Sequence, residues 1–360
     1  MRKTEHILIV LPNWVGDVVM ATPALEALRR HFAGARFTHM APPAALDVLS
    51  GGEHDGRIED RSRRRPRFLN FPRQVRTLRR EEFSLGVLFP NSFHSALLCR
   101  LGGVKVLAGY DRDGRGWMLR HKLSAPRDEA GELAPVPTVE YYNRLARMLG
   151  AEATSRRMSL PVRPEDDAAA ESLLAEAGVD RRRPVVMLNP GGSFGPSKLW
   201  AADRYAELAD RLGERRGAQI LLNAAPSERA IAAAVARAMA TAPAINFAER
   251  ANSIGLLKGL LRRCDLLITN DTGARHVAAA LGVGVVTIFG STDPTWARID
   301  YPRERIVKVD VPCGPCQKKR CPLPPGEANH QCMKAVTVEM VLTAAEELLA
   351  EAGRSGTGAE

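Results

Sequence analysis

The sequence predicts an α/β protein built from two halves, each with a parallel, doubly wound sheet. Short apolar runs alternate with helix-like stretches from Ile7 onward, and the alternation starts again at Pro184. Strands separated by helices favour a parallel sheet, because each helix returns the chain to the same edge. The chain also has 360 residues, which is more than one ordinary domain requires.

The first half begins with a buried-type strand at Ile7–Leu11, followed by a loop and a helix-like stretch at Asp17–Phe32. Pro23 interrupts the periodicity of that stretch, so we expect its first turn to be a separate short piece. Further strands are expected at Arg36–Ala41 and Ser84–Phe89. This order is that of a doubly wound sheet.

The second half repeats the pattern after a proline-containing segment with an Ala/Glu-rich helix, Pro161–Pro184. The expected strands are Pro184–Asn189, Gln219–Leu222, Leu266–Thr269 and Val285–Gly290, and the expected helices are Ala201–Arg215, Ser227–Met239, Ser253–Arg263 and Ala274–Leu281. We therefore expect domains at 1–160 and 161–335. A helix at 336–352 is expected to pack back toward the N-terminal domain, and the glycine-rich tail at 353–360 is expected to be disordered.

Composition narrows the function classes. No apolar stretch reaches the roughly 18–20 residues that span a bilayer. The start of the chain leads into a strand-like pattern rather than a cleavable signal, which predicts a cytoplasmic protein. The net charge of +10 indicates an anionic partner. Much of it comes from a dense arginine cluster between Arg57 and Arg80, which could contact nucleic acid, contact an anionic membrane or form a solvated face.

The six cysteines fall into two groups. Cys99 and Cys264 have apolar neighbours and are expected in the core. The others, Cys313, Cys316, Cys321 and Cys332, cluster near the C-terminus. Such a cluster could hold zinc or an iron–sulfur cluster, although its spacing matches no standard zinc module.

The turn Asn270-Asp271-Thr272-Gly273 lies between an apolar strand and a helix-like stretch. A helix that begins at the carboxyl edge of a sheet directs free N–H groups there, which favours a phosphate-bearing ligand. Gly273 would let the backbone approach that ligand closely. The alternative is that Asp271 and Thr272 only cap the helix.

Three further positions are candidates for chemistry. Asp17 follows the first strand and begins a helix, so it is either a general base or an N-terminal cap. Lys198 closes a glycine-rich loop, Asn189–Lys198, and could neutralise a departing pyrophosphate; Leu199 follows it, so the loop is not a P-loop. His276 either faces the ligand or packs in the helix.

Asp111-x-Asp113 has the spacing of a metal-binding pair found in some sugar-nucleotide enzymes. Arginines and glycines surround the pair, which favours a turn instead.

Taken together, three segments resemble glycosyltransferase family 9, the ADP-heptose–lipopolysaccharide heptosyltransferases. They are Leu11–Asp17 (LPNWVGD) with Ala21–Leu25, the loop from Asn189 to Trp200, and Thr269–Leu281 followed by Phe289–Pro294. They occur in the family's order and cover nearly the whole chain. The Trp14–Asp17 version looks most like heptosyltransferase II, which adds the second heptose.

The resemblance implies a GT-B fold, in which two Rossmann-like domains face each other across a cleft, and an inverting, metal-independent transfer. Its site residues carry over by position. Asp17 would be the catalytic base and Lys198 would stabilise departing ADP. The donor would contact Gly191, Ser193, Glu228, Asp271, Thr272, Gly273 and His276, and the acceptor would contact Asn13, Trp14 and Gly16 in the N-terminal domain.

The implied partners are ADP-heptose and a lipid A–inner-core acceptor. With these partners, the arginine cluster is expected to contact the anionic acceptor or the membrane surface on the cytoplasmic side. The segment Asn223–Glu228 lacks the glycine-rich turn expected there, which puts its contacts with adenosine in doubt.

Three rival functions stay open. The chain could be a family 9 enzyme with another donor or acceptor, or a non-catalytic nucleotide-binding relative. A nucleic-acid binder is disfavoured, because only Phe68 and Phe71 interleave the arginines and no nucleic-acid module is present.

Overall fold

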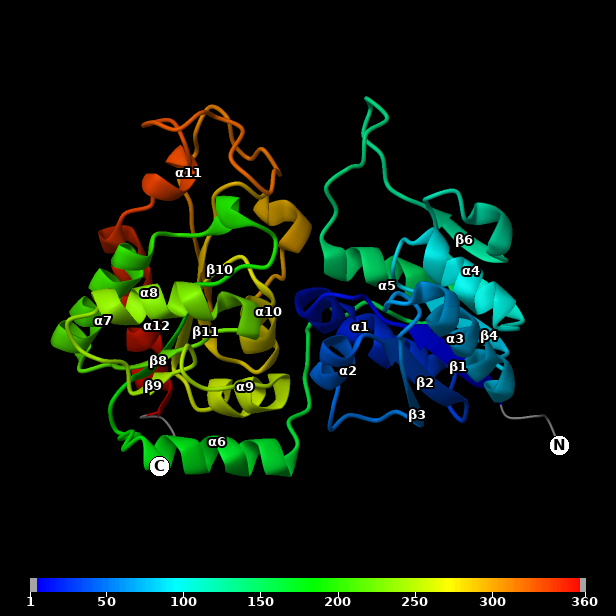
Figure 1. The fold of residues 1–360 in the computed structure, drawn as a ribbon, viewed down its shortest axis with the longest axis horizontal. Helices are drawn as coiled ribbons and strands as arrows, with labels where there is room; N and C mark the ends of the chain where they lie inside the picture. Colours follow the sequence, from blue (N-terminus) through cyan, green and yellow to red (C-terminus); the bar gives the residue numbers. More distant parts are fainter. Residues whose placement is uncertain (1–4, 357–360) are drawn as a thin grey trace. The chain divides into compact units, whose positions relative to one another are not determined.

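The computed structural model describes residues 5–356, and the chain divides into two compact units (Figure 1). The N-terminal unit comprises Met1–Pro161 and Thr295–Ile299, and the C-terminal unit comprises Val162–Pro294 and Asp300–Glu360. The division thus falls one residue after the expected 160/161 boundary. The return of Thr295–Ile299 to the N-terminal unit has no signal in the sequence; Thr138 Oγ1 donates to Trp296 O there, at 2.9 Å.

The N-terminal unit has a six-stranded sheet in the order β3-β2-β1-β4-β5-β6, with every neighbouring pair parallel. Its strands are β1 His6–Val10, β2 Arg36–Ala41, β3 Gly56–Glu59, β4 Leu85–Leu88, β5 Val106–Asp111 and β6 His121–Ser124. Its helices are α1 Val15–His31, α2 Pro43–Val48, α3 Arg67–Glu81, α4 Phe93–Leu101 and α5 Thr138–Met148, with a short 3₁₀ turn, η1, at Gly116–Met118. The strand order reverses between β1 and β4, where such sheets bind ligands.

Helix α1 is continuous, so the expectation of a separate first turn before Pro23 is wrong. A proline inside a helix leaves the carbonyl four residues earlier without its N–H partner. Here that carbonyl belongs to Val19, and it accepts a hydrogen bond from Thr22 Oγ1 at 2.7 Å. The threonine replaces the missing donor, and the helix continues to His31.

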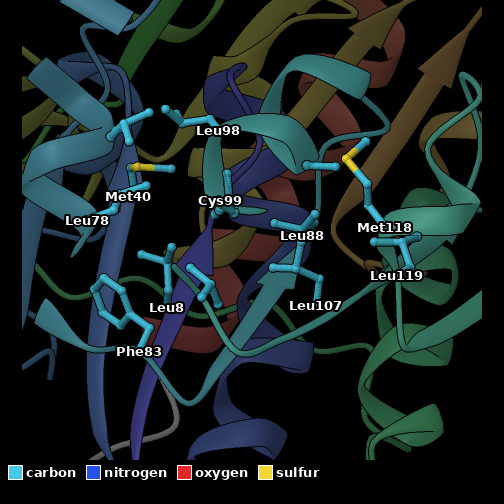
Figure 2. Close-up of a cluster of buried hydrophobic side chains, with 14 residues drawn as sticks. Leu8, Met40, Leu78, Phe83, Leu88, Leu98, Cys99, Leu107, Met118 and Leu119 are labelled. Carbon is cyan, nitrogen blue, oxygen red and sulfur yellow. The ribbon is translucent and has the colours of Figure 1, made fainter. Parts of the chain in front are cut away.

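One apolar cluster of the N-terminal unit lies between its sheet and the helices α3 and α4 (Figure 2). It joins the strands through Leu8, Met40, Leu88 and Leu107 to the helices through Leu78, Leu98 and Cys99, with Met118 and Leu119 beside them. The expectation that Cys99 and Cys264 are core residues is confirmed, since both are buried and burial raises the pKa of both thiols.

The C-terminal unit repeats the architecture with the strand order β12-β11-β10-β7-β8-β9, again parallel throughout. Its strands are β7 Val185–Asn189, β8 Gln219–Leu222, β9 Ile245–Asn246, β10 Leu266–Asn270, β11 Gly284–Ile288 and β12 Glu304–Val307. Its helices are α6 Pro164–Glu176, α7 Ala202–Arg216, α8 Arg229–Ala238, α9 Ile254–Leu261, α10 Gly273–Ala280, α11 Gln331–Lys334 and α12 Val338–Gly356. Its 3₁₀ turns are η2 Pro196–Lys198 and η3 Pro226–Glu228. A further 3₁₀ turn, η4 Pro294–Ala297, lies at the segment that returns to the N-terminal unit. The order reverses between β7 and β10.

The expectation that the last helix, α12, packs toward the N-terminal domain stays a prediction. Within its own unit, α12 packs against α7 and against β10, β11 and β12. The reason is its apolar stripe: Val341, Leu342, Ala345 and Leu348 are fully buried. An ion pair between Arg216 Nε and Glu346 Oε1, at 3.1 Å, adds a link to α7. The expectation of disorder over 353–360 is wrong for residues 353–356, because α12 continues to Gly356; residues 357–360 lie outside the described residues.

Across residues 5–356, no helix combines the length and the apolar character that crossing a lipid bilayer requires.

We expect the folded protein to lose stability in mild acid because His39 is buried. Burial, with the nearby His54 and Arg29, lowers the pKa of His39 from 6.5 to about 3. His39 then stays neutral in the folded chain while it binds a proton in the unfolded chain below pH 6.5. Its contribution to stability is therefore present above pH 6.5 and is lost as the pH falls toward 3.

Between pH 7 and pH 5, the neutral His39 should lower the free energy of unfolding by about 2 kcal/mol. Urea titrations at both pH values should show a smaller acid loss for His39→Gln than for the wild type. An equal loss in the two proteins would contradict the assignment to His39.

Candidate active site

The carboxyl ends of β7 and β10 lie side by side where the strand order of the C-terminal unit reverses. Two of the predicted segments follow these strands: the glycine-rich loop with Lys198 after β7, and the turn with Asp271 after β10. The structure therefore brings these segments together, as the fold prediction implied.

Lys198 and Asp271 form an ion pair with 2.5 Å between Nζ and Oδ2, and both side chains are 11% exposed. The ammonium also lies 4.7 Å from the ring centre of Phe194. Arg275 NH1 lies 3.6 Å from the other Asp271 oxygen. Burial raises the pKa of Asp271, but the positive charges of Lys198 and Arg275 outweigh it and hold the pKa below its ordinary value. The carboxylate is therefore ionised and fixes the position of Lys198.

Arg275 is itself fully buried, and its guanidinium forms a bidentate pair with Glu304 on β12. Glu304 Oε1 also accepts a hydrogen bond from Thr287 Oγ1 on β11, at 2.6 Å. A buried cation needs such pairing to offset its desolvation. The pairing locks the first turn of α10 to the sheet.

Thr272 is the N-cap residue of α10, yet its side chain makes no capping hydrogen bond. Its hydroxyl instead lies 3.1 Å from Asn189 Nδ2 and 3.0 Å from Thr269 Oγ1. The simple capping interpretation of Asp271 and Thr272 is therefore wrong, since Asp271 pairs with Lys198. The N–H groups at the start of α10 have no side-chain cap from Thr272, which suits an anionic ligand.

A chain of asparagines joins the last residue of β7 to the loops that follow β8 and β9. Asn252 Nδ2 donates to Asn223 Oδ1, and Asn223 Nδ2 donates to Asn189 Oδ1, both at 2.6 Å. Asn189 in turn donates to Thr269 Oγ1 at 3.0 Å. Sequence reasoning missed Asn189, Asn223 and Asn252 as site residues. They fix the spacing of the strand ends around the turn at Thr272.

Asn270 shapes the glycine-rich loop. Its amide nitrogen donates to Pro190 O at 2.9 Å and to Gly191 O at 3.1 Å. A Cβ at Gly191 would meet the carboxylate of Glu228, so the absence of a side chain there leaves room for that carboxylate. Glu228 thus lies against the loop and also accepts a hydrogen bond from Ala225 N at 3.2 Å; its contact with the donor stays a prediction. Ser193 is exposed on the same loop.

His276 is buried one turn into α10, and its Nδ1 has no hydrogen-bond partner within residues 5–356. Burial, with the charge of Arg275, lowers the pKa of His276 to about 3. The imidazole is therefore neutral at physiological pH.

In the N-terminal unit, the loop after β1 carries Asn13 and Trp14, both exposed, and the buried Gly16 is the second residue of α1. Trp14, not Asp17, is the N-cap residue of α1, so Asp17 is a first-turn acid that the helix dipole favours in its ionised form. The N-cap interpretation of Asp17 is thus wrong. Burial, with the charge of Asp17 next in size, raises the pKa of Tyr142 on α5 well above its ordinary value. Tyr142 is therefore a neutral neighbour of Asp17.

The loop after β4, across the point of reversal from β1, depends on the buried Arg115. Its guanidinium donates to the carbonyl oxygens of Pro90, Ser92 and Tyr110, and to Asn91 Oδ1 at 3.4 Å. Tyr141 Oη lies 3.2 Å from the same Asn91 oxygen. Sequence reasoning placed Arg115 in a turn and missed its role in holding Asn91 at the sheet edge.

The turn interpretation of Asp111-x-Asp113 is favoured, since Asp111 pairs with Lys122 at 3.1 Å and Asp113 has a left-handed φ of 56°.

The four C-terminal cysteines are all free thiols. Cys321 Sγ accepts from His330 N at 3.3 Å, and burial and then the other cysteines raise the pKa of Cys332. Within the part of the chain that the structure describes, no three His, Cys, Asp or Glu side chains adopt a metal-holding arrangement. A structural metal at these cysteines stays a prediction. Their segment instead braces the glycine-rich loop, because Lys318 O accepts from Ser197 Oγ at 2.5 Å.

The sequence profile described as glycosyltransferase family 9 (heptosyltransferase) matches residues 72–326. Lipooligosaccharide heptosyltransferase 2 of Campylobacter jejuni is 26% identical over 351 residues, which cover 95% of this chain and 98% of that protein.

Among solved structures, a family 9 glycosyl transferase from Veillonella parvula superposes with a TM-score of 0.82 at 20% identity, covering 98% of this chain and 99% of that one. The ADP-heptose lipopolysaccharide heptosyltransferase II of Escherichia coli superposes with a TM-score of 0.76 at 24% identity, covering 96% and 99%. These likenesses confirm the predicted pair of Rossmann-like domains.

Proposed function

Because this chain belongs to glycosyltransferase family 9 and has its GT-B fold, we propose that it transfers heptose from ADP-heptose to the inner core of lipopolysaccharide. The observation that carries the proposal is the buried pair of Lys198 and Asp271 beside the start of α10. This arrangement offers a fixed cation and backbone N–H groups to one diphosphate. The proposed sugar and acceptor class are inferred from the relatives named above. One is named a lipooligosaccharide heptosyltransferase, and another is named an ADP-heptose lipopolysaccharide heptosyltransferase.

The proposed reaction is a direct displacement at the anomeric carbon. Asp17 accepts the proton of the acceptor hydroxyl as its oxygen bonds to that carbon. The bond from the carbon to the donor phosphate breaks on the opposite side, so the configuration inverts and ADP leaves with the electron pair. Lys198 and the N–H groups of Gly273 and its neighbours stabilise the new negative charge.

The other predicted residues take roles that fit their surroundings. Asp271, an ionised carboxylate, repels a diphosphate, so its proposed role is to hold Lys198 and Arg275 in place. Thr272, His276, Gly191 and Ser193 line the donor, and Glu228 receives a ribose hydroxyl. Asn13, Trp14 and Gly16 line the acceptor beside Asp17.

The proposed chemistry uses the Lys198 cation where other enzymes use a metal ion. A structural metal at Cys313, Cys316, Cys321 and Cys332 is a separate proposal, tested by elemental analysis of the purified chain. The exposed arginines between Arg57 and Arg80 are proposed to receive the anionic acceptor, with the protein at the cytoplasmic face of the inner membrane.

Release of ADP from ADP-heptose by the purified chain tests the function. We expect release only when a lipid A–inner-core acceptor is present, and little release from ADP-glucose or UDP-glucose as matched donors. Calorimetry with ADP is the control for an intact donor site. Tight ADP binding without release would contradict the donor or acceptor assignment and favour another family 9 specificity or a non-catalytic relative. Absence of ADP binding would contradict the donor site itself.

A further inference from the structure

The N-terminal unit exposes several large apolar side chains that follow the carboxyl ends of its strands. Phe68 on α3 is 76% exposed and Trp117 on η1 is 72% exposed, while Leu69 and Phe93 are 42% and 40% exposed. We call these four residues the aromatic rim. Trp14 is left out because it belongs to the candidate acceptor site.

The rim is not part of the core that its elements cover. On α3 the core contacts are made by Val75 and Leu78, which are 9% and 0% exposed. Trp117 lies between two buried residues, Gly116 and Met118, and Met118 enters the apolar cluster of Figure 2. The rim side chains therefore remain in water although neighbouring positions are buried. Several large apolar side chains exposed near one another are typical of an interaction surface.

Ser92 joins the segments that carry the rim. Arg63, five residues before Phe68, donates to Ser92 Oγ at 2.6 Å. Arg115, two residues before Trp117, donates to Ser92 O at 3.3 Å. Phe93 follows Ser92 directly. The three segments that carry the rim residues thus meet at Ser92 of the N-terminal unit.

The rim is surrounded by positive charge. Residues 61–80 contain no Asp or Glu, and their arginines are Arg61, Arg63, Arg64, Arg65, Arg67, Arg73, Arg76, Arg79 and Arg80, all exposed. Glu59 pairs with both Arg61 and Arg64, at 2.5 and 2.6 Å. The four carboxylates that flank the segment, at Glu59, Asp60, Glu81 and Glu82, do not balance its nine arginines, so the segment carries an excess of positive charge beside exposed aromatic rings.

We propose that the aromatic rim and the arginines around it dock the protein on an anionic phospholipid bilayer. Aromatic rings favour the boundary between headgroups and acyl chains, and arginines favour the phosphates and the negative surface potential outside it. The rim supplies the apolar part of that contact and the arginines supply the charge complementarity. The purpose of the docking, delivery of a membrane-bound acceptor to Asp17, rests on the proposed function.

Sedimentation of the full chain with sucrose-loaded vesicles tests the proposal. We expect binding to vesicles of phosphatidylcholine and phosphatidylglycerol in a 3:1 ratio, and little binding to phosphatidylcholine alone. Raising the salt should weaken it, because exposed charges are screened. The double variant Phe68→Ser/Trp117→Ser should bind at least about 10-fold more weakly. Replacing Arg64, Arg65 and Arg67 with Gln should weaken binding on the order of 100-fold.

Two matched controls come from the C-terminal unit. Ile306 and Met340 are 41% and 39% exposed, so Ile306→Ser/Met340→Ser removes similar apolar exposure elsewhere. Replacing Arg181, Arg182 and Arg183 with Gln removes three adjacent positive charges elsewhere. Both controls should bind vesicles like the wild type. Equal losses in rim and control variants would overturn the proposal, as would wild-type binding that ignores phosphatidylglycerol.

Membrane docking and the proposed heptosyl transfer can be tested separately. Transfer to a deacylated, water-soluble core acceptor should be unchanged in Phe68→Ser/Trp117→Ser, while transfer to acceptor in vesicles should fall. If the wild type shows no transfer to either acceptor but vesicle binding follows the rim, the function fails and the docking surface stands. If light scattering shows a dimer that this variant dissociates, and vesicle binding is unchanged, the surface joins two copies of the chain and the proposal is overturned.

Discussion

Asp17→Asn is expected to lower kcat for acceptor-dependent ADP release by about three orders of magnitude, within the range of general base catalysis. The amide has the size of the carboxyl group but cannot take the proton of the acceptor hydroxyl. The donor residues around Lys198 and Asp271 belong to the C-terminal unit, so the affinity for ADP should stay as in the wild type. Steady-state kinetics and calorimetry with ADP measure the two quantities.

Asp113→Asn is the matched control for this substitution. Asp113 is an exposed carboxylate of the same unit, and its left-handed backbone suits Asn as well as Asp. It should keep wild-type activity, which also tests the disfavoured metal pair at Asp111 and Asp113. Wild-type kcat in Asp17→Asn, or a parallel loss of ADP affinity, would contradict the role of Asp17 as the base.

The sequence predicted the central strands well because they are buried on both faces and form continuous apolar runs. Residues of β1, β7, β10 and β11 are buried at every position. The edge strands lack this signal: β3 has the sequence GRIE with no buried residue, and β9 has only two residues. Pairing with a neighbour, rather than the local pattern, makes these segments strands.

The candidate site also contains residues that the sequence can identify and residues that it cannot. Asp17, Lys198 and Asp271 follow strands in recognisable motifs, so sequence could identify them. The residues that hold them could not be found, because their contacts join distant parts of the chain. Asn189 reaches Thr272 across 83 residues, and Arg275 reaches Glu304 across 29. Nothing near Arg115 in the sequence indicates that its guanidinium is fully buried under the loop at Asn91.

Lys198→Gln is expected to lower kcat by about 100- to 1,000-fold, the range found when one group that stabilises a developing negative charge is removed. The departing diphosphate would keep the N–H groups of α10 but lose the cation. The affinity for ADP should also fall, because the product carries the same charge. Kinetics and calorimetry on the variant measure both effects.

The substitution has a second consequence that must be separated from the first. Asp271 is 11% exposed and would lose its ionic partner at 2.5 Å, keeping Arg275 at 3.6 Å and the hydroxyl of Thr292 at 3.2 Å. A buried charge without close pairing is destabilising and could distort the turn. The double variant Lys198→Gln/Asp271→Asn removes both charges and so removes that strain. If Lys198 acts on the leaving group, the double variant regains thermal stability but not kcat. If Lys198 only neutralises Asp271, the double variant regains both, and the proposed chemical role of the lysine is wrong.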